Sequence, residues 1–231
     1  MKLSVALAAY HGEAYIEAQI ASILAQLGEA DELIVSDDDP GGETGAIVQR
    51  LAAADARIRY FAGPGQGVVK NFEHALAFCT GDVVFLSDQD DVWLPGKVAA
   101  VTAAIAGGAD LVLHDAKVTD ADLQVIAPSY FAAHGFTRSF LRTLLRNTYV
   151  GCCMAFTRQV LTESTPFPGD IPMHDWWIAL CAMRRGRQIA LLREPLLLWR
   201  RHGDNVTGGK TPLAAKLRWR MTLLRALAKR Q

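Results

Sequence analysis

Three aspartates lie close together after a run of apolar residues. Val83–Leu86 form the continuous apolar pattern of a buried strand, and Asp88, Asp90 and Asp91 follow it directly. In open α/β sheets the ligand crevice lies beyond the carboxyl ends of the strands, where crowded carboxylates repel one another unless a cation lies between them. Mg²⁺ and Mn²⁺ prefer oxygen ligands and often bridge to substrate phosphates. The stretch therefore predicts a metal–diphosphate site.

Two other interpretations of these aspartates are weaker. An Asp before Leu94-Pro95 suits the start of a helix, so one of the three carboxylates is expected to be a cap. An EF-hand calcium loop counted from Asp88 would need Gly where Trp93 stands and Glu where Ala99 stands. Three carboxylates in one turn after a buried strand favour the metal site over a solvated turn.

Strand and helix patterns alternate through the first half of the chain. Strands are expected over 3–9, 32–36, 57–62 and 82–87, and helices over 13–27, 43–54, 68–79 and 94–106. This order predicts right-handed βαβ units and a parallel sheet. Asp37 and Asp38 end the second strand, so we expect them on the same rim as Asp88–Asp91, one cluster for base and ribose and the other for the metal. A Rossmann dehydrogenase and a P-loop enzyme are disfavoured because neither glycine motif is present.

The second half has fewer clean repeats. Strands are expected over 110–118 and 149–156, helices over 139–147 and 173–185, and a last strand pair over 188–192 and 195–199, with a loop over 119–136. The asymmetry fits a single domain over residues 1–209. We expect a nucleotide-binding half, 1–115, and an acceptor-binding half, 116–209, followed by a separate C-terminal helix in 210–231.

Charge is unevenly distributed along the chain. The 231 residues have a formal net charge of zero, but residues 210–231 carry seven basic residues and no acid. Apolar residues of this tail recur at helical spacing: Leu213, Leu217, Met221, Leu224 and Ala228. A basic amphipathic helix is typical of contact with an anionic membrane, here through residues 213–230, and packing against the acidic body is the alternative. Nucleic-acid binding is not expected, because the basic residues do not continue into the body.

Cysteine usage and the start of the chain bear on location. Cys79, Cys152, Cys153 and Cys181 form no C-x-x-C pair and are expected to be buried thiols in a reducing compartment. The first residues run into a strand without a signal peptide, and no apolar run is as long as a transmembrane helix. We therefore expect a cytoplasmic protein, with the inner face of the cell membrane as a second location because of the tail.

Six short motifs occur along the chain: Ala9-Tyr10-His11-Gly12, Ser36-Asp37-Asp38, Lys70-Asn71-Phe72, Ser87–Trp93, His174-Asp175-Trp176-Trp177 and Trp199–Asn205. Their order and spacing resemble those of a family-two glycosyltransferase of the GT-A fold, in the bacterial rhamnosyltransferase-like subgroup. The resemblance covers nearly the whole chain. It implies an α/β GT-A fold with a mostly parallel central sheet flanked by helices, and residues 1–115 become a nucleotide-sugar-binding half.

The resemblance also implies an activity. The expected reaction is inverting and depends on Mg²⁺ or Mn²⁺. It would move rhamnose or a similar sugar from a dTDP- or UDP-sugar to a saccharide or lipid-linked saccharide in surface polysaccharide synthesis. The residue patterns leave two other classes open, a non-catalytic nucleotide-sugar-binding or scaffold protein and a nucleotidyltransferase of similar fold. A nucleotidyltransferase would be expected to carry a basic, glycine-rich loop after the first strand, and Ala9–Glu13 is not one.

The resemblance assigns roles residue by residue. Asp175 would be the general base, while Asp90 of the Asp-x-Asp motif and His202 would bind the metal. The nucleotide-sugar would contact Ala9, Tyr10, Asp37, Asp38, Lys70, Asn71, Asp88 and Arg200. Within that set Asp38 would accept a hydrogen bond from the pyrimidine ring, and Arg200 would offset diphosphate charge. Asp91, Trp93, His174 and Trp176 are further candidates.

Structural roles remain open for several of these residues. Asp175 could cap its helix, and the helix dipole there is expected to keep the carboxylate ionised. Lys70 and Asn71 could simply start a helix, while Trp93, Trp176 and Trp177 could belong to the core. Pro40 after Asp39 departs from the usual loop of the family and restricts Asp39, so base and ribose contacts are expected to differ.

Overall fold

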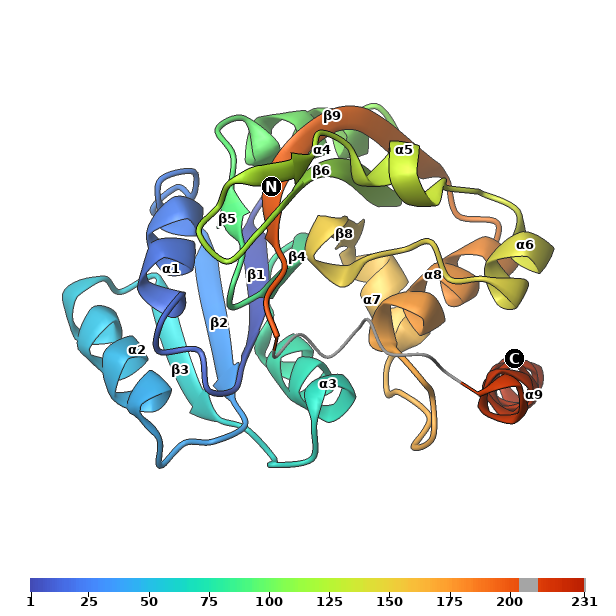
Figure 1. Cartoon of the computed structure of the whole chain (residues 1–231), viewed down its shortest axis with the longest axis horizontal. Coiled ribbons are helices and arrows are strands. Elements are labelled where there is room, and N and C mark those ends of the chain that lie inside the picture. Colours follow the sequence, from blue (N-terminus) through green and yellow to red (C-terminus); the bar gives the residue numbers. More distant parts are fainter. Residues whose placement is uncertain (204–211, 231) are drawn as a thin grey trace.

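The computed structural model describes residues 1–203 and 212–230, and within them nine strands form one sheet in the order β3-β2-β1-β4-β8-β6-β9-β5, with β7 paired to β6 (Figure 1). The strands are β1 (Leu3–Ala9), β2 (Glu32–Asp37), β3 (Ile58–Ala62), β4 (Val83–Asp88), β5 (Val92–Trp93), β6 (Leu111–Thr119), β7 (Val125–Ala127), β8 (Met154–Thr157) and β9 (Ile189–Arg200). The predicted boundary between residues 209 and 210 lies outside the described residues, as do Asp204 and Asn205 of the last motif.

Helices cover both faces of this sheet. They are α1 (Ile16–Leu24), α2 (Glu43–Ala54), α3 (Val68–Phe78), α4 (Lys97–Ala106), α5 (Tyr130–His134), α6 (Phe140–Leu145), α7 (Arg158–Ser164), α8 (His174–Arg184) and α9 (Leu213–Lys229), with a 3₁₀ turn, η1, over Gly151–Cys153. The α/β fold class predicted from the sequence is confirmed.

The first half contains the predicted parallel strands. β1 pairs in parallel with β2 on one side and with β4 on the other, and β2 pairs with β3. The chain direction across the sheet reverses between β3 and β4, so right-handed crossovers place α1 and α2 on one face and α3 on the other. The ends of β1 and β4 therefore form a switch point, the place where open α/β sheets bind ligands.

The second half makes the sheet mixed. β8 lies antiparallel between β4 and β6, and β6 pairs in parallel with β9. The expected last strand pair is one continuous strand, β9. It passes Pro195 because the register of β6 and β9 shifts near Asp115, and a bulge tolerates a residue without an N–H donor.

Two further boundaries differ from the sequence prediction. Residues 119–136, expected as a loop, contain β7 and α5. The strand expected over 149–156 starts only at Met154, because η1 occupies the three preceding residues. All four cysteines are free and buried, as predicted.

The C-terminal helix α9 packs against the body with one face. Leu223 and Leu227 are 0% and 3% exposed, and the Arg184 side chain donates to the Leu227 carbonyl. Figure 1 shows α9 beside α6 and α8. The packing alternative considered from the sequence thus describes this face of the helix. No helix within the described residues combines the length and apolar character needed to cross a bilayer.

Candidate active site

Gln89 joins the loops that follow β1 and β4. The Tyr10 N–H donates to Gln89 Oε1 at 2.7 Å, and Gln89 Nε2 donates to the Tyr10 carbonyl at 2.7 Å. Gly12 permits this approach, since a Cβ there would lie 2.1 Å from Gln89 Oε1. The bridge leaves the Tyr10 side chain 57% exposed at the switch point, where the sequence predicts nucleotide contact. Ala9 beside it is buried.

The aspartates after β2 organise their own loops. Asp37 is fully buried and accepts from the Tyr60 hydroxyl at 3.2 Å, and burial raises the pKa of its carboxyl. The Asp38 carboxylate accepts the N–H groups of Gly65 and Gly67 at 2.9 and 2.7 Å. The residue predicted to bind the pyrimidine ring therefore fixes the glycine-rich loop over residues 63–67. A carboxylate has further acceptor positions, so base binding would add to this role.

Asn71 and Lys70 make structural contacts at the start of α3. The buried Asn71 amide donates to the carbonyls of Ala9 and Ser36 at 3.0 Å each, tying the ends of β1 and β2 together. Lys70 forms an ion pair with Glu73 at 2.6 Å. Both residues lie in the first turn of α3, in agreement with the alternative that they start a helix.

Pairing of β5 with β9 brings the last motif to the Asp88–Asp91 loop. Val92 lies opposite Leu198, so the end of β9 reaches the loop that precedes β5. His202 Nε2 lies 2.8 Å from Asp90 Oδ2. The Arg200 backbone N–H donates to Asp91 Oδ1 at 3.0 Å, and Arg200 Nε donates to the Asp90 carbonyl at 2.6 Å. Asp90 of one motif thus meets Arg200 and His202 of another, distant motif in space.

The donor set at Asp90 and His202 suits a divalent cation. Octahedral ligands about 2.1 Å from a Mg²⁺ ion are about 3 Å apart, close to the separation of Asp90 Oδ2 and His202 Nε2. Asp91 Oδ2 is buried without a hydrogen-bond partner among the described residues, so the same loop also holds a carboxylate oxygen that a cation or a proton would satisfy. The residues present therefore fit the predicted metal.

A second set of potential ligands lies on the interior side of the same loop. One ligand atom each from Asp88, Asp91 and Cys152 lies within 4.8 Å of the others. Lys97 is fully buried next to this set, and its ammonium donates to the Cys152 carbonyl at 2.8 Å and lies 4.1 Å from the Trp93 ring centroid. A thiol is a poor ligand for Mg²⁺, and the ammonium already supplies positive charge, so the Asp90–His202 pair is the better metal site.

Burial shifts the titration of the groups behind the loop. Burial, followed by the neighbouring carboxylates of Asp90 and Asp175, raises the pKa of Asp88 to about 7. Burial lowers the pKa of the Lys97 ammonium to about 8. A cation bound on this loop would oppose the first shift by favouring the ionised carboxylate.

Asp175 is held at the start of α8 by hydrogen bonds to its carboxylate. Asn147 Nδ2 donates to Oδ1 at 3.1 Å and the Gly151 N–H donates to Oδ2 at 3.2 Å. The cap position of α8 is Met173, so Asp175 is not the helix cap. Burial raises the pKa of Asp175 to about 6 against these donors. The expected effect of the helix dipole on this carboxylate is therefore outweighed by burial.

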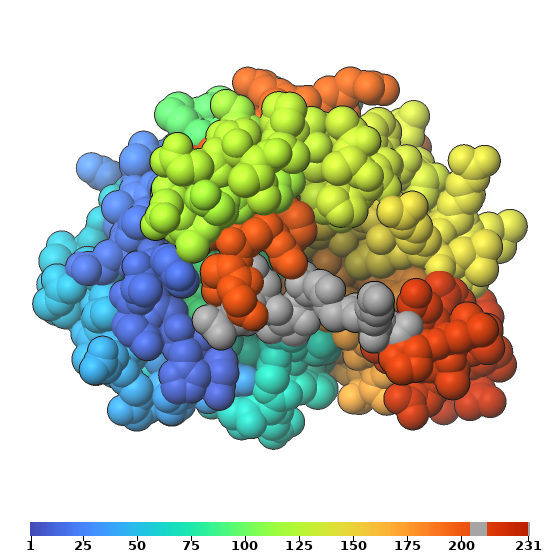
Figure 2. Space-filling view, viewed as in Figure 1, coloured from blue at the N-terminus to red at the C-terminus, as the bar shows by residue number. Residues whose placement is uncertain are grey.

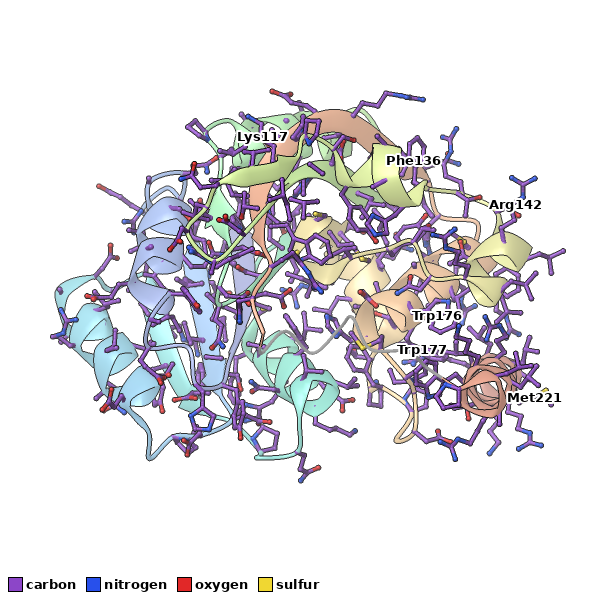
Figure 3. The ribbon with its side chains drawn as sticks, viewed as in Figure 1. Lys117, Phe136, Arg142, Trp176, Trp177 and Met221 are labelled. Carbon is purple, nitrogen blue, oxygen red and sulfur yellow. The ribbon has the colours of Figure 1, made fainter. Side chains whose placement is uncertain are left out.

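Three aromatic residues proposed near the site belong to the core. Trp93 and Trp176 are 3% and 5% exposed, and Trp176 Nε1 donates to the Thr143 carbonyl at 2.7 Å. His174 stacks on Phe72 with ring centroids 4.0 Å apart, and burial lowers its pKa to about 3. Figure 3 shows Trp176 and the neighbouring Trp177 between α8 and α9. The core role left open for the tryptophans matches their positions.

A family model decides the classification. The model described as glycosyl transferase family 2 matches residues 4–164. The chain belongs to glycosyltransferase family 2. The matched range includes Asp88 and Asp90, while Asp175 and His202 of this glycosyltransferase lie beyond it.

Curated relatives of the glycosyltransferase carry related names. The uncharacterized glycosyltransferase alr2836 of a Nostoc species is 27% identical over 220 residues, 89% of this chain and 66% of the relative. The dTDP-rhamnosyl transferase RfbG of Shigella flexneri is 25% identical over 239 residues, 95% of this chain and 79% of RfbG. A GalNAc(5)-diNAcBac-PP-undecaprenol beta-1,3-glucosyltransferase of Campylobacter jejuni is 34% identical over 102 residues, 43% of this chain and 33% of that enzyme. The chain thus spans two thirds or less of the length of two of these relatives.

Solved structures share the fold of the glycosyltransferase. TarS 1–349 of S. aureus in complex with UDP-GlcNAc gives a TM-score of 0.78 at 18% identity, over 100% of this chain and 68% of TarS. The mannosyltransferase PcManGT of Pyrobaculum calidifontis, in complex with GDP-Man and Mn²⁺, gives 0.63 at 19% identity, over 99% of this chain and 62% of PcManGT. The likeness confirms the predicted GT-A fold.

Sequence reasoning missed the residues of the glycosyltransferase that position its candidate site. Gln89 stands inside the aspartate motif, yet nothing in the sequence shows that it bridges to Tyr10. Asn147 and Gly151 lie in the segments predicted as a helix and a strand, and neither pattern shows that they contact Asp175. Tyr15 lies beneath the last motif, with the Arg200 guanidinium 4.6 Å from its ring centroid and the His202 ring 5.1 Å away. The one signal in the sequence was Gly151, because a glycine in an apolar stretch often marks a place where another part of the chain approaches the backbone closely.

Proposed function

We propose that the protein is an inverting, divalent-metal-dependent glycosyltransferase. It transfers rhamnose or a similar sugar from a dTDP- or UDP-sugar to a saccharide or lipid-linked saccharide acceptor in surface polysaccharide synthesis. The observation that carries this proposal is the meeting of His202 Nε2 and Asp90 Oδ2 at 2.8 Å, on the rim where β1 and β4 end. Residues 112 positions apart converge there only because β9 pairs with β5.

The donor site lies between the ends of β1, β2 and β4. Asp90 and His202 would hold Mg²⁺ or Mn²⁺, and the exposed Tyr10 and the loop fixed by Asp38 form the nucleotide side. A bound cation would supply positive charge that stabilises the diphosphate leaving group. Arg200 holds the Asp90 backbone through its hydrogen bond to the Asp90 carbonyl. Its effect on diphosphate binding therefore acts in part through the position of this loop.

The acceptor is activated by Asp175. Its carboxylate has a pKa of about 6, so it is mostly ionised at neutral pH and close to the value that suits a general base. Asp175 takes the proton from the acceptor hydroxyl as the oxygen attacks the anomeric carbon. A single base on the face opposite the leaving group gives inversion. Asn147 and Gly151 orient the carboxylate for this step.

The choice of donor rests on the relatives. RfbG is named a dTDP-rhamnosyl transferase, TarS is solved with UDP-GlcNAc, and PcManGT is solved with GDP-Man and Mn²⁺. The glucosyltransferase of Campylobacter jejuni has an undecaprenol-linked acceptor in its name. The names of RfbG and of the TarS complex favour a pyrimidine nucleotide-sugar, although PcManGT binds a purine one. The name of the Campylobacter jejuni enzyme favours a saccharide acceptor with a lipid carrier, which suits a cytoplasmic enzyme at the inner face of the membrane.

Calorimetric titration of UDP and dTDP, each with and without Mn²⁺, tests the donor site. Wild type is expected to bind one nucleotide in a metal-dependent manner, and Asp90→Ala and His202→Ala are each expected to weaken that binding at least tenfold through the loss of one metal ligand. Glu29→Ala is the matched control, because Glu29 is exposed in the turn before β2, at the opposite end of the strands from the candidate site.

Three results would redirect the proposal. Failure to bind either nucleotide under any condition would overturn the donor site. Binding with no transfer, and no effect of Asp175→Asn, would favour a non-catalytic nucleotide-sugar-binding or scaffold protein. Release of inorganic diphosphate from a nucleoside triphosphate would instead indicate a nucleotidyltransferase.

A further inference from the structure

Helix α9 exposes a second apolar face, beside the one that packs on the body. Leu213, Leu217, Met221 and Leu224 are 73%, 57%, 49% and 41% exposed, whereas Leu223 and Leu227 are buried. The exposed four recur three or four residues apart and therefore lie along one side of the helix. The apolar stripe found in the sequence is thus this outward face, and other residues hold α9 to the protein.

Helix α6 extends the exposed apolar surface. Leu141 and Leu145 are 68% and 61% exposed, and the Arg220 side chain of α9 donates to the Leu145 carbonyl of α6. Figure 2 shows the red C-terminal helix beneath the yellow segment that contains α6, at the same end of the molecule. Figure 3 shows Arg142 of α6 and Met221 of α9 pointing away from the body on that side. We call the exposed residues of these two helices and their flanks, within 138–146 and 212–230, the α6–α9 surface.

The charges of the α6–α9 surface all have one sign. Residues 138–146 and 212–230 contain no Asp or Glu. Their basic residues are Arg138, Arg142, Arg146, Lys216, Arg218, Arg220, Arg225, Lys229 and Arg230, and all but Arg220 and Arg230 are exposed. Exposed leucines among cations, without an acidic residue, are unusual for a surface that faces only water. The combination matches anionic headgroups above an apolar layer.

We propose that the α6–α9 surface docks on an anionic lipid bilayer, with the four apolar residues of α9 and the two leucines of α6 entering the headgroup boundary. A second copy of the chain fits poorly, because two such cationic surfaces would repel each other. A lipid surface satisfies both features at once, since acidic headgroups pair with the Lys and Arg side chains while the leucines reach the acyl region.

Docking would also orient the candidate acceptor site. Leu145 on α6 lies two residues before Asn147, whose side chain holds Asp175. The loop that carries this contact therefore starts at the proposed membrane surface. The orientation rests on the proposed function, since it presents a lipid-linked acceptor to Asp175, whereas the docking itself does not depend on catalysis.

Vesicle co-sedimentation of the full chain tests the docking. The probes are phosphatidylcholine vesicles with about 30 mol% phosphatidylglycerol and vesicles of phosphatidylcholine alone. We expect at least tenfold tighter binding to the anionic vesicles, weakened by salt. The double variant Leu217→Glu/Met221→Glu is expected to lose at least tenfold of this binding. The matched control is Val125→Glu/Ile126→Glu on β7, whose side chains are 52% and 63% exposed on another part of the surface.

The outcomes separate this inference from the donor site. Equal vesicle binding by wild type and Leu217→Glu/Met221→Glu, or no binding by wild type, would overturn the docking. A wild-type protein that forms a dimer and does not bind vesicles would assign the surface to a second copy instead. Circular dichroism and unchanged nucleotide binding show that the variant is folded. If wild type binds vesicles but neither nucleotide, the proposed function is refuted and the docking is not.

Discussion

The acid limb of the pH–rate profile should belong to Asp175, and Asn147 should control its position. Asn147 Nδ2 donates to the Asp175 carboxylate at 3.1 Å, a contact that favours the ionised form. A hydrogen bond to a buried charge contributes about 1.5–3 kcal/mol, and the partly exposed Asn147 lies at or below the lower end. Its loss should therefore raise the pKa of Asp175 by about one unit, since one unit corresponds to about 1.4 kcal/mol.

This shift converts into a rate that can be measured. Burial sets the pKa of Asp175 at about 6, so wild-type kcat should fall as the pH drops through about 6. At pH 6 wild type would keep about half of its plateau rate, whereas a base with a pKa near 7 would keep about one tenth. We expect Asn147→Ala and Asn147→Asp to show this upward shift of the limb. The assay is release of nucleoside diphosphate at saturating donor and acceptor between about pH 5 and 8.5.

Two variants distinguish titration from loop structure. Asn147 Oδ1 also accepts the Tyr149 N–H at 3.0 Å, and Asn147→Asp keeps that acceptor while it removes the donor to Asp175. The added carboxylate is a like charge, so the limb of Asn147→Asp should shift at least as far as that of Asn147→Ala. Thr148→Val is the matched control, because Thr148 is buried on the same loop and its hydroxyl has no partner among the described residues. A lower kcat with an unmoved acid limb in both Asn147 variants would refute the reasoning and leave Asn147 a purely structural role.

Three other predictions concern the base, the core and the first loop. Asp175→Asn should lower kcat about 10²- to 10⁴-fold with nucleotide affinity within about twofold of wild type; an activity loss below tenfold would exclude Asp175 as the base. His174 has a folded pKa of about 3, below its unfolded value near 6.5, so only the unfolded chain gains a proton as the pH falls through this window. Protonation of this one group in the unfolded chain should lower the free energy of unfolding by about 2 kcal/mol between pH 7.5 and 5. Urea unfolding should show this decrease in wild type but not in His174→Phe, and parallel pH curves for the two proteins would contradict it. Gly12→Ala should weaken nucleotide binding, because its Cβ would lie 2.1 Å from Gln89 Oε1; the control Gly41→Ala meets no atom within 4 Å, so equal effects of the two changes would refute the role of the Gln89 bridge.

The first half of the fold was predictable from local pattern. Its strands are continuous apolar runs, its helices have periodic apolar residues, and the connections allow few topologies. The second half was harder because its pairing partners are far apart in sequence. Pro195 looked like a break between two strands, and only the register shift against Asp115 shows how one strand passes it. The sequence around Pro195 does not show a bulge, because the bulge depends on pairing with β6, which is far away in the sequence.

The candidate site shows the same division. The resemblance assigned both Asp90 and His202 to the metal, and the structure brings the two side chains together. Their supports, Gln89 and Tyr15, were not predictable, since a side chain that bridges two loops has no periodicity or spacing. Asn71 has a structural role that the resemblance did not show. Its Nδ2 donates to the carbonyls of Ala9 and Ser36, whereas its Oδ1 has no hydrogen-bond partner among the described residues.

Several residues assigned to the donor thus first serve to hold the rim together. Asp38 fixes the glycine-rich loop, Asn71 joins β1 to β2, and Arg200 anchors the loop of Asp90. A rim held by such contacts is ordered before the donor arrives, so binding would cost less conformational entropy. The same contacts explain why substitution of these residues should disturb nucleotide binding even where no atom touches the ligand. Asp90 and Asp175 differ from them, because their proposed tasks require direct contact with the metal and the acceptor.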